Sequence, residues 1–178
     1  MNEELIIAGF GGQGVLSMGM TLAYAGMVED KQVAWIPSYG PEMRGGTANC
    51  TVIVSDTKVS SPIISSYDTA IVLNQPSLEK FESRVKPGGI LIYEANNILN
   101  PPTRKDINIY AIPAAVEADK IGNKKTMNMI ILGAFLSKKP LVSVKSIMEG
   151  LSKVLPERNH NLLPINEKAL KHGLKLIK

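Results

Sequence analysis

Glycine residues near the amino terminus are the first group in this sequence whose types and spacing could bind a ligand. Gly9, Gly11 and Gly14 fit the pattern G-x-G-x-x-G, and a short apolar run precedes them. Glycine permits a positive φ angle and lets a ligand approach the bare backbone. A helix that starts after such a turn offers free N–H groups and the positive end of its dipole to an anion. The segment therefore predicts a site for a nucleotide-like ligand; the alternative is a tight β–α turn that binds nothing.

The segment 37–47 is the second candidate, because its two prolines and three glycines exclude a regular helix or a central strand. We expect this loop beside the glycine turn, since both follow the carboxyl ends of neighbouring strands, the usual ligand side of an open α/β sheet. Arg44 is flanked by small residues, and its planar guanidinium suits a phosphate or a carboxylate. The alternative is a salt bridge between Arg44 and Glu42 or another local carboxylate.

The second predicted strand argues against a nicotinamide cofactor. A dinucleotide fold usually places an acidic residue at the end of this strand, where it binds a ribose hydroxyl. Here that end carries the segment 36–39, whereas Glu29 and Asp30 precede the strand. A phosphate-bearing ligand with a different adenosine contact fits better than NAD. A stand-alone oxidoreductase that binds NAD or FAD remains an alternative of another class.

Apolar runs alternate with helical patterns along the chain, which is typical of a doubly wound α/β fold. The predicted strands are 5–8, 32–36, 47–55, 69–73, 90–93 and 107–112. The predicted helices are 12–28, 74–85, 114–120, 126–136, 143–154 and 164–177. We therefore expect residues 1–178 to form a single domain with a mostly parallel, Rossmann-like sheet and C-terminal helices.

Composition narrows the classes of function. Hydrophobic residues make up 44% of the sequence, yet no apolar run approaches the roughly 20 residues of a membrane span. The acidic start of the chain does not resemble a signal peptide, so we expect a cytoplasmic protein. Residues 90–178 hold 14 Lys/Arg against seven Asp/Glu, which suits an acidic partner, a phosphate-rich ligand or simply a solvated surface. The lysines are scattered and few aromatics accompany them, which argues against nucleic acid.

Several chemistries lack the residues that they need. Cys50 is the only cysteine, so the chain forms no internal disulfide and cannot alone hold an iron–sulfur cluster, which takes about four cysteines. We expect Cys50 to be a packed thiol and both His160 and His172 to be surface residues. No Walker motif, paired carboxylates, His/Cys metal cluster or nucleophile elbow is present. The sequence therefore predicts a binding subunit whose chemistry other chains complete.

Three segments together resemble the gamma subunits of the 2-oxoacid:ferredoxin oxidoreductases. They are GFGGQGV after a predicted strand, PSYGPEMRGGTANCTVIVSD, and NQPSLEKFESRVKPGG. The resemblance runs from about Glu4 to Leu136, and SYGPEMRGGTANC is its most specific part. Its form is most similar to gamma subunits of 2-oxoglutarate enzymes; subunits of branched-chain 2-oxoacid or pyruvate enzymes are the alternatives.

The resemblance implies a complex that decarboxylates a 2-oxoacid on thiamine diphosphate and transfers the acyl group to coenzyme A (CoA). For 2-oxoglutarate the product would be succinyl-CoA. Two electrons would pass through iron–sulfur clusters to ferredoxin or a similar acceptor. Thiamine diphosphate, Mg²⁺ and the clusters would belong to alpha, beta and delta partner subunits, so this chain would hold no cofactor or catalytic residue. We expect the isolated chain to be inactive, and a homodimer through its apolar surface is a further option.

The same resemblance implies that three segments contribute to the CoA site. The matching positions are Phe10, Gly11, Gly12, Gln13, Gly14, Ser38, Tyr39, Gly40, Glu42, Met43, Arg44, Gly45, Gly46 and Asn128. Relatives carry lysines in the second loop, so Arg44 is the expected phosphate-binding cation here. From spacing alone, Asn128 is either a ligand contact or a capping or core amide. A purely structural subunit, whose glycine loop contacts only protein, is the remaining alternative.

Overall fold

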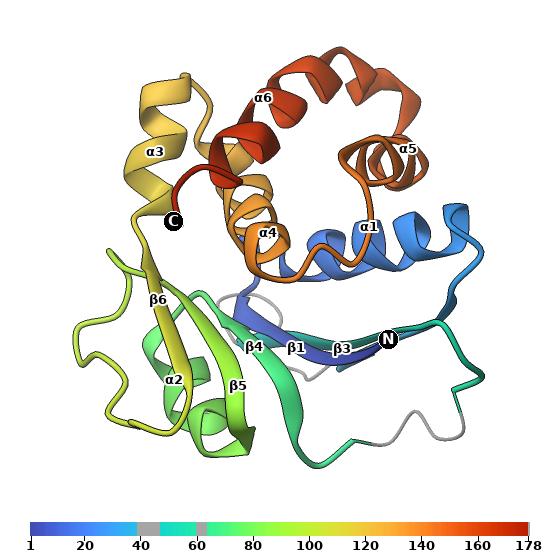
Figure 1. Ribbon diagram of the computed structural model, residues 1–178. Coiled ribbons are helices and arrows are strands. Elements are labelled where there is room, and N and C mark those ends of the chain that lie inside the picture. Colours follow the sequence, from blue (N-terminus) through green and yellow to red (C-terminus); the bar gives the residue numbers. More distant parts are fainter. Residues whose placement is uncertain (39–46, 60–63, 178) are drawn as a thin grey trace.

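A six-stranded sheet lies at the centre of the fold in the order β2-β3-β1-β4-β5-β6 (Figure 1). The computed structural model describes residues 1–38, 47–59 and 64–177. The strands are β1 (Asn2–Phe10), β2 (Gln32–Ser38), β3 (Thr47–Ser55), β4 (Tyr67–Val72), β5 (Val85–Glu94) and β6 (Asn108–Ile112). Parallel pairing joins β1 to β4, β4 to β5 and β5 to β6, whereas β3 is antiparallel to both β1 and β2. The predicted α/β class with a mostly parallel sheet is confirmed.

The first two strands in the chain are not neighbours in the sheet, contrary to the expectation from the sequence. β3 lies between β1 and β2, because the segment after the second loop returns antiparallel to both. β2 also extends beyond the predicted strand and includes Pro37. A proline cannot donate to a ladder, and β2 accommodates it because β2 is an edge strand.

Helices cover both faces of the sheet. On one face lie α1 (Val15–Val28), α4 (Met127–Lys138), α5 (Val144–Val154) and α6 (Leu163–Gly173) (Figure 1). On the other face α2 (Gln75–Phe81) packs against β1 and β4, and η1 (Glu82–Arg84) follows it. α3 (Ala114–Ile121) and the turn η2 (Lys124–Thr126) precede α4, and η3 (Glu157–Leu162) joins α5 to α6. No helix within the described ranges is both long and apolar enough to cross a membrane.

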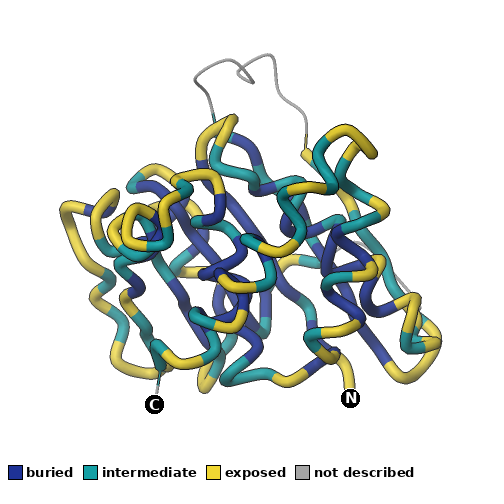
Figure 2. The backbone as a smooth tube through the Cα atoms, turned by 90° about the horizontal axis from the view of Figure 1, so that it is seen from above, coloured by how far each residue is buried: buried dark blue, intermediate teal, exposed yellow. Residues whose placement is uncertain are grey.

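The strand β1 is buried on both sides, which explains its continuous apolar run. Leu5 and Ile7 belong to the core under the large helical layer, whereas Ile6 and Ala8 belong to the core under α2. Successive side chains of a strand point to opposite faces, so a central strand needs apolar residues at every position. Figure 2 shows the buried positions gathered inside a more exposed periphery.

The helices α4 and α6 approach each other closely through two glycines. A Cβ atom at Gly133 would clash with the carbonyl oxygen of Leu170, and one at Gly173 would clash with that of Ile130. Residues 129–136 of α4 are all buried between the sheet and α6. This contact joins the C-terminal part of α6 to the first half of α4.

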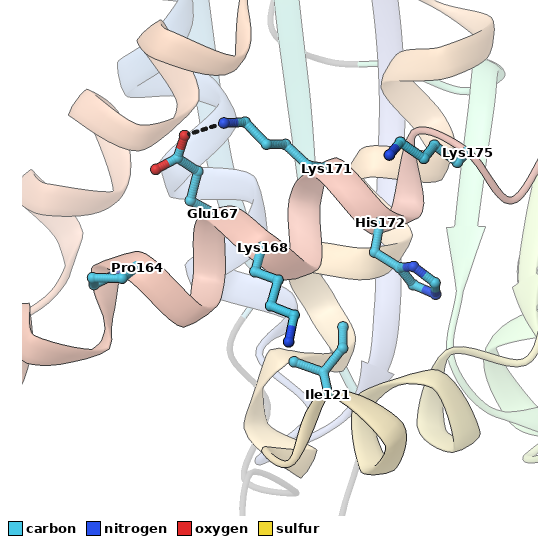
Figure 3. A pocket seen from close by; sticks show the side chains of 7 residues that line it. All are labelled: Ile121, Pro164, Glu167, Lys168, Lys171, His172 and Lys175. Atoms are coloured by element: carbon cyan, nitrogen blue, oxygen red, sulfur yellow. Dashed lines mark ion pairs between the residues drawn. The ribbon is translucent and has the colours of Figure 1, made fainter.

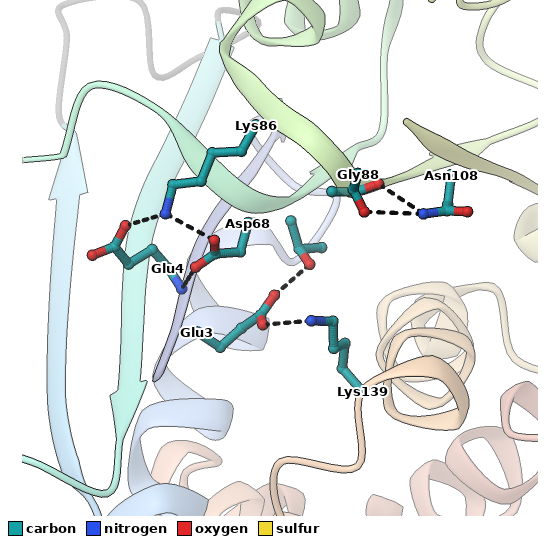
Figure 4. Close-up of polar contacts among 9 residues, drawn as sticks. Glu3, Glu4, Asp68, Lys86, Gly88, Asn108 and Lys139 are labelled. Carbon is teal, nitrogen blue, oxygen red and sulfur yellow. Dashed lines mark hydrogen bonds and ion pairs between the residues drawn. The ribbon is translucent and has the colours of Figure 1, made fainter. Parts of the chain in front are cut away.

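Charged side chains at the amino-terminal edge of the sheet form ion pairs with one another (Figure 4). Lys86 Nζ lies 2.8 Å from both Glu4 Oε2 and Asp68 Oδ1. Glu3 is 2% exposed, accepts a hydrogen bond from the Thr69 hydroxyl and pairs with Lys139 Nζ at 3.2 Å. We call Glu3, Glu4, Asp68, Lys86 and Lys139 the amino-edge charges.

Glu29, the acidic residue that precedes β2, anchors α5. Its Oε1 accepts hydrogen bonds from Ser143 N at 2.6 Å and from Ser146 Oγ at 2.7 Å. Partial burial acts to raise the pKa of Glu29, but these hydrogen bonds outweigh it and lower the pKa below its usual value. The Glu29 carboxylate therefore has a structural role, because it holds the start of α5 through Ser143 and Ser146.

Candidate functional site

The glycine turn joins β1 directly to α1, and the Gln13 side chain holds it closed. Gln13 Oε1 accepts a hydrogen bond from Phe10 N at 2.6 Å, and Gln13 Nε2 donates to Leu73 O at 3.2 Å. The Gln13 N–H also donates to Phe10 O at 3.2 Å. Both ends of this side-chain amide are thus engaged within the protein. Gln13 shapes the turn, and its neighbours carry the exposed backbone.

Two glycines of the turn adopt conformations that favour glycine. Gly12 has φ 95° and Gly14 has φ 76°. Gly14 is the N-cap of α1, and no side chain caps the helix there. A Cβ atom at Gly12 would meet no atom within 4 Å, so the backbone at this position faces open space. The first turn of α1 therefore presents uncapped N–H groups beside an open surface, an arrangement that binds anions.

Asn128 lies directly against this turn. A Cβ atom at Gly14 would come within 2.6 Å of Asn128 Nδ2. Because Gly14 has no side chain, there is room for the Asn128 amide beside the turn. Asn128 belongs to the first turn of α4, and its Oδ1 accepts a hydrogen bond from Met129 N at 2.9 Å. No hydrogen bond of the Nδ2 group is found within the described part of the chain, so this donor remains available next to the turn.

A groove of about 360 Å³ opens where the turn meets Asn128. This volume falls in the range of small-molecule sites. We call it the glycine groove. Its lining residues are Gly12, Gln13, Gly14, Ser17, Asn123, Lys124, Lys125, Thr126, Met127, Asn128, Leu151, Leu155, Asn159, Leu162 and Asn166. A second hollow of about 310 Å³ shares Gly12, Gly14 and Ser17 with it and extends past Phe10 and Gly11 to Ala48.

The second predicted segment reaches the same edge of the sheet. Phe10 pairs with Thr47 and Ser38 pairs with Asn49, so the ends of β1 and β2 lie at one rim with the start of β3 between them. Ser38 is exposed and does not line the glycine groove. The other predicted positions of this loop lie outside the described residues: Tyr39, Gly40, Glu42, Met43, Arg44, Gly45 and Gly46.

The far wall of the groove was not predicted from the sequence. The segment η2 contributes Lys124 and Lys125, and the segments η3 and α6 contribute Asn159 and Asn166. Asn123 caps η2 by accepting from Lys125 N at 3.0 Å, a local signal that the sequence does contain. Asn159 and Asn166 carry no such signal, because they reach the groove only through the packing of α6 on α4.

Other reactive side chains outside the groove are engaged in the fold. Burial raises the pKa of the Cys50 thiol to about 12, as expected for a packed thiol. His172 Nε2 lies 2.6 Å from Glu117 Oε2 and so links α6 to α3, a contact that its surface assignment did not anticipate. The described ranges contain no group of three His, Cys, Asp or Glu residues that could hold a metal ion.

A larger cavity of about 480 Å³ lies between α3 and α6 and contains none of the predicted site residues (Figure 3). It is lined by Ile121, Pro164, Glu167, Lys168, Lys171, His172 and Lys175. Lys171 pairs with Glu167 at 2.6 Å, and the other lysines are exposed. This cavity offers lysines on a helix face, and none of the glycine-turn backbone lines it. The glycine groove is therefore the better candidate site.

Strand, glycine turn and helix together define a Rossmann-like α/β domain of the kind that binds phosphate-bearing ligands. Comparison with known proteins gives the family. The chain belongs to the pyruvate ferredoxin/flavodoxin oxidoreductase family, whose model matches residues 4–176. This membership favours a subunit of an oxoacid oxidoreductase over a stand-alone NAD or FAD enzyme.

The names of the curated relatives mention three substrates, which are ketoisovalerate, 2-oxoglutarate and pyruvate. The ketoisovalerate oxidoreductase subunit VorA of Methanothermobacter thermautotrophicus is 42% identical over 131 residues, which are 74% of this chain but 27% of VorA. This chain therefore spans about a quarter of the VorA length. The 2-oxoglutarate synthase subunit KorC of Methanothermobacter marburgensis is 32% identical over 163 residues, 88% of each chain.

A solved structure supports the same relationship. The gamma subunit of the keto/oxoacid ferredoxin oxidoreductase from Geobacter sulfurreducens superposes with a TM-score of 0.84 at 26% identity. The match covers 98% of this chain and 95% of that subunit. The resemblance to gamma subunits predicted from the sequence is confirmed.

Proposed function

We propose that this chain acts as the gamma subunit of a 2-oxoacid:ferredoxin oxidoreductase complex and contributes to its CoA site. The observation that carries the proposal is the meeting of the glycine turn and Asn128 on one groove. The uncapped N–H groups at the start of α1 would bind the diphosphate of CoA, and the free amide of Asn128 would orient it. These residues would bind and position CoA without taking part in bond making.

The chemistry in this proposal belongs to partner chains. Thiamine diphosphate with Mg²⁺ would support decarboxylation, and iron–sulfur clusters would carry the two electrons to ferredoxin or a similar acceptor. We assign these groups to alpha, beta and delta subunits, since the single cysteine of this sequence is fully buried and cannot supply a cluster.

An exposed apolar face supports assembly with partner chains. Tyr24 and Met27 of α1 are 37% and 56% exposed. Next to them a hollow of about 320 Å³ is lined by Met20, Ala23, Tyr24, Met27, Val33 and Trp35. Contiguous exposed apolar residues of this kind mark interaction surfaces.

We propose 2-oxoglutarate as the substrate of the complex, because KorC matches this chain along nearly its whole length. Ketoisovalerate is the second candidate, favoured by the higher identity to VorA over a shorter segment. Rates of dye reduction by the assembled complex with each 2-oxoacid, at saturating CoA, decide between them. A rate with 2-oxoglutarate below that with ketoisovalerate would reverse our choice.

The CoA assignment is tested with Asn128→Ala in the assembled complex. We expect the KM for CoA to rise about tenfold, since one hydrogen bond to a charged ligand is lost, while the KM for the 2-oxoacid stays unchanged. Size-exclusion chromatography serves as the control for assembly. Loss of assembly, or an unchanged KM for CoA in an intact complex, would instead support a purely structural subunit.

A further inference from the structure

We propose that Lys125 binds the 3′-phosphate of CoA, at a position in the glycine groove separate from the diphosphate site at the glycine turn. This inference rests on the proposed CoA function of the groove. It adds a phosphate-binding cation to the expected Arg44, and it draws only on described residues.

The charge of the groove points to an anionic ligand with more than one phosphate position. Among the described residues, no Asp or Glu lines the groove, whereas Lys124 and Lys125 both do. The remaining polar lining consists of amides, hydroxyls and glycine backbone. By contrast, the cavity between α3 and α6 contains Glu167, which pairs with Lys171. Lys124 pairs with Asp119, which lies outside the lining, so only the ammonium of Lys125 is left without a counter-ion among the described residues.

Lys125 is the better placed of the two lysines. Both side chains are exposed, but Lys124 Nζ already lies 3.7 Å from Asp119 Oδ1. The Lys125 ammonium makes no ion pair or hydrogen bond with the described part of the chain. A lysine ammonium is a compact point charge that suits a terminal phosphate.

The backbone around Lys125 is held in place before any ligand binds. Asn123 Oδ1 accepts from Lys125 N, and the hydroxyl of Thr126 donates to Asn123 O at 2.8 Å. Thr126 is 1% exposed, so this turn is anchored to the core immediately before Asn128. A fixed backbone reduces the ordering cost of binding through the flexible side chain.

CoA carries two separate phosphate positions, and the groove offers two different kinds of donor. The uncapped N–H groups of the glycine turn lie on one wall, as the proposed function requires for the diphosphate. Lys125 belongs to the wall formed by η2, so a ligand whose diphosphate rests on the turn would present its remaining phosphate to this lysine.

The test compares CoA with dephospho-CoA, which lacks only the 3′-phosphate, in equilibrium binding to the assembled complex. For Lys125→Gln we expect the affinity for CoA to fall roughly fivefold to tenfold and the affinity for dephospho-CoA to stay unchanged. Lys168→Gln, an exposed lysine outside the groove, is the matched control, and we expect it to change each affinity less than twofold. The salt dependence of CoA binding should also weaken in Lys125→Gln.

Equal losses for both ligands would overturn the inference, because Lys125 would then serve the diphosphate. Unchanged affinities for both would overturn it as well. In either case the proposed function would still hold if the wild-type complex binds CoA and Asn128→Ala weakens this binding. Failure of the wild-type complex to bind CoA would overturn both.

Discussion

Charged groups are arranged differently at the amino edge of the central sheet, where β1, β4 and β5 begin, and at its carboxyl edge, where β1 meets the glycine turn. At the amino edge, Glu3, Glu4 and Asp68 each contact a lysine (Figure 4). At the carboxyl edge, the glycine groove contains lysines, amides and uncapped backbone N–H groups, and no carboxylate of the described chain lines it. The first arrangement is complete within the protein, whereas the second leaves the Lys125 ammonium without an ion pair and the start of α1 without a side-chain cap among the described residues. The difference separates charges that support the fold from the charges to which we assign ligand binding.

The largest effect is expected at the amino edge. Lys139→Met would leave the buried Glu3 carboxylate with only the Thr69 hydroxyl, and we expect it to lower the free energy of unfolding by about 1–3 kcal/mol. Urea unfolding of the isolated chain measures this loss. The double variant Glu3→Gln with Lys139→Met should recover part of it, and CoA binding should not change. An unchanged midpoint in the single variant would contradict the structural role of this pair.

At the carboxyl edge, Gly14→Ala should affect both stability and binding. The new Cβ would strain a left-handed residue at a cost of about 1–2 kcal/mol and push Asn128 away from the turn. We expect the affinity for CoA to fall about tenfold.

Gly88→Ala is the matched control for this substitution, since Gly88 has φ 77°, open space around it and a place at the amino edge. It should show a similar loss of stability and normal CoA binding. Equal effects of the two variants on CoA affinity would refute the distinction between the edges.

A smaller effect is expected from the carboxylate that anchors α5. Because the pKa of Glu29 is lowered in the folded protein, its stabilisation is present above its usual pKa of 4.5 and is lost as the pH falls below that value. Glu29→Gln should reduce the free energy of unfolding by about 1 kcal/mol at pH 7, as for a lost helix cap. The difference from the wild type should shrink on acidification to pH 3, as followed by urea unfolding. A constant difference across this range would contradict the assignment.

The smallest effect is expected in the cavity between α3 and α6. Lys168→Gln combined with Lys175→Gln removes two of its exposed cations, and we expect CoA affinity to change less than twofold at physiological salt. Equilibrium binding of CoA provides the measurement. A loss as large as that in Gly14→Ala would move the binding site to this cavity.

Local sequence patterns predicted most helices and strands, but they did not predict which strands lie side by side in the sheet. Apolar runs marked the buried strands, and the glycine turn marked the start of α1. The position of β3 between β1 and β2 could not be predicted, because an apolar run carries no information about strand direction. Likewise, Asn159 and Asn166 reach the groove through the packing of α6 on α4 and η2, a long-range packing that no local pattern reports.

The site itself shows the same limit. Spacing left open whether Asn128 contacts a ligand or caps a helix, and only its place beside Gly14 favours the ligand contact. Lys125 received no weight in the sequence because lysines are common in its half of the chain. Lys125 becomes a candidate only once the structure shows that no acidic residue among those described lines the groove.

Hydrogen–deuterium exchange of the assembled complex, with and without CoA, tests the central claim most directly. The account predicts that CoA slows exchange at residues 11–17 and 123–128 and leaves the amino-edge segments 2–5 and 85–89 unchanged. Slowed exchange confined to the amino-edge segments or to residues 164–175, with none at the glycine turn, would contradict it.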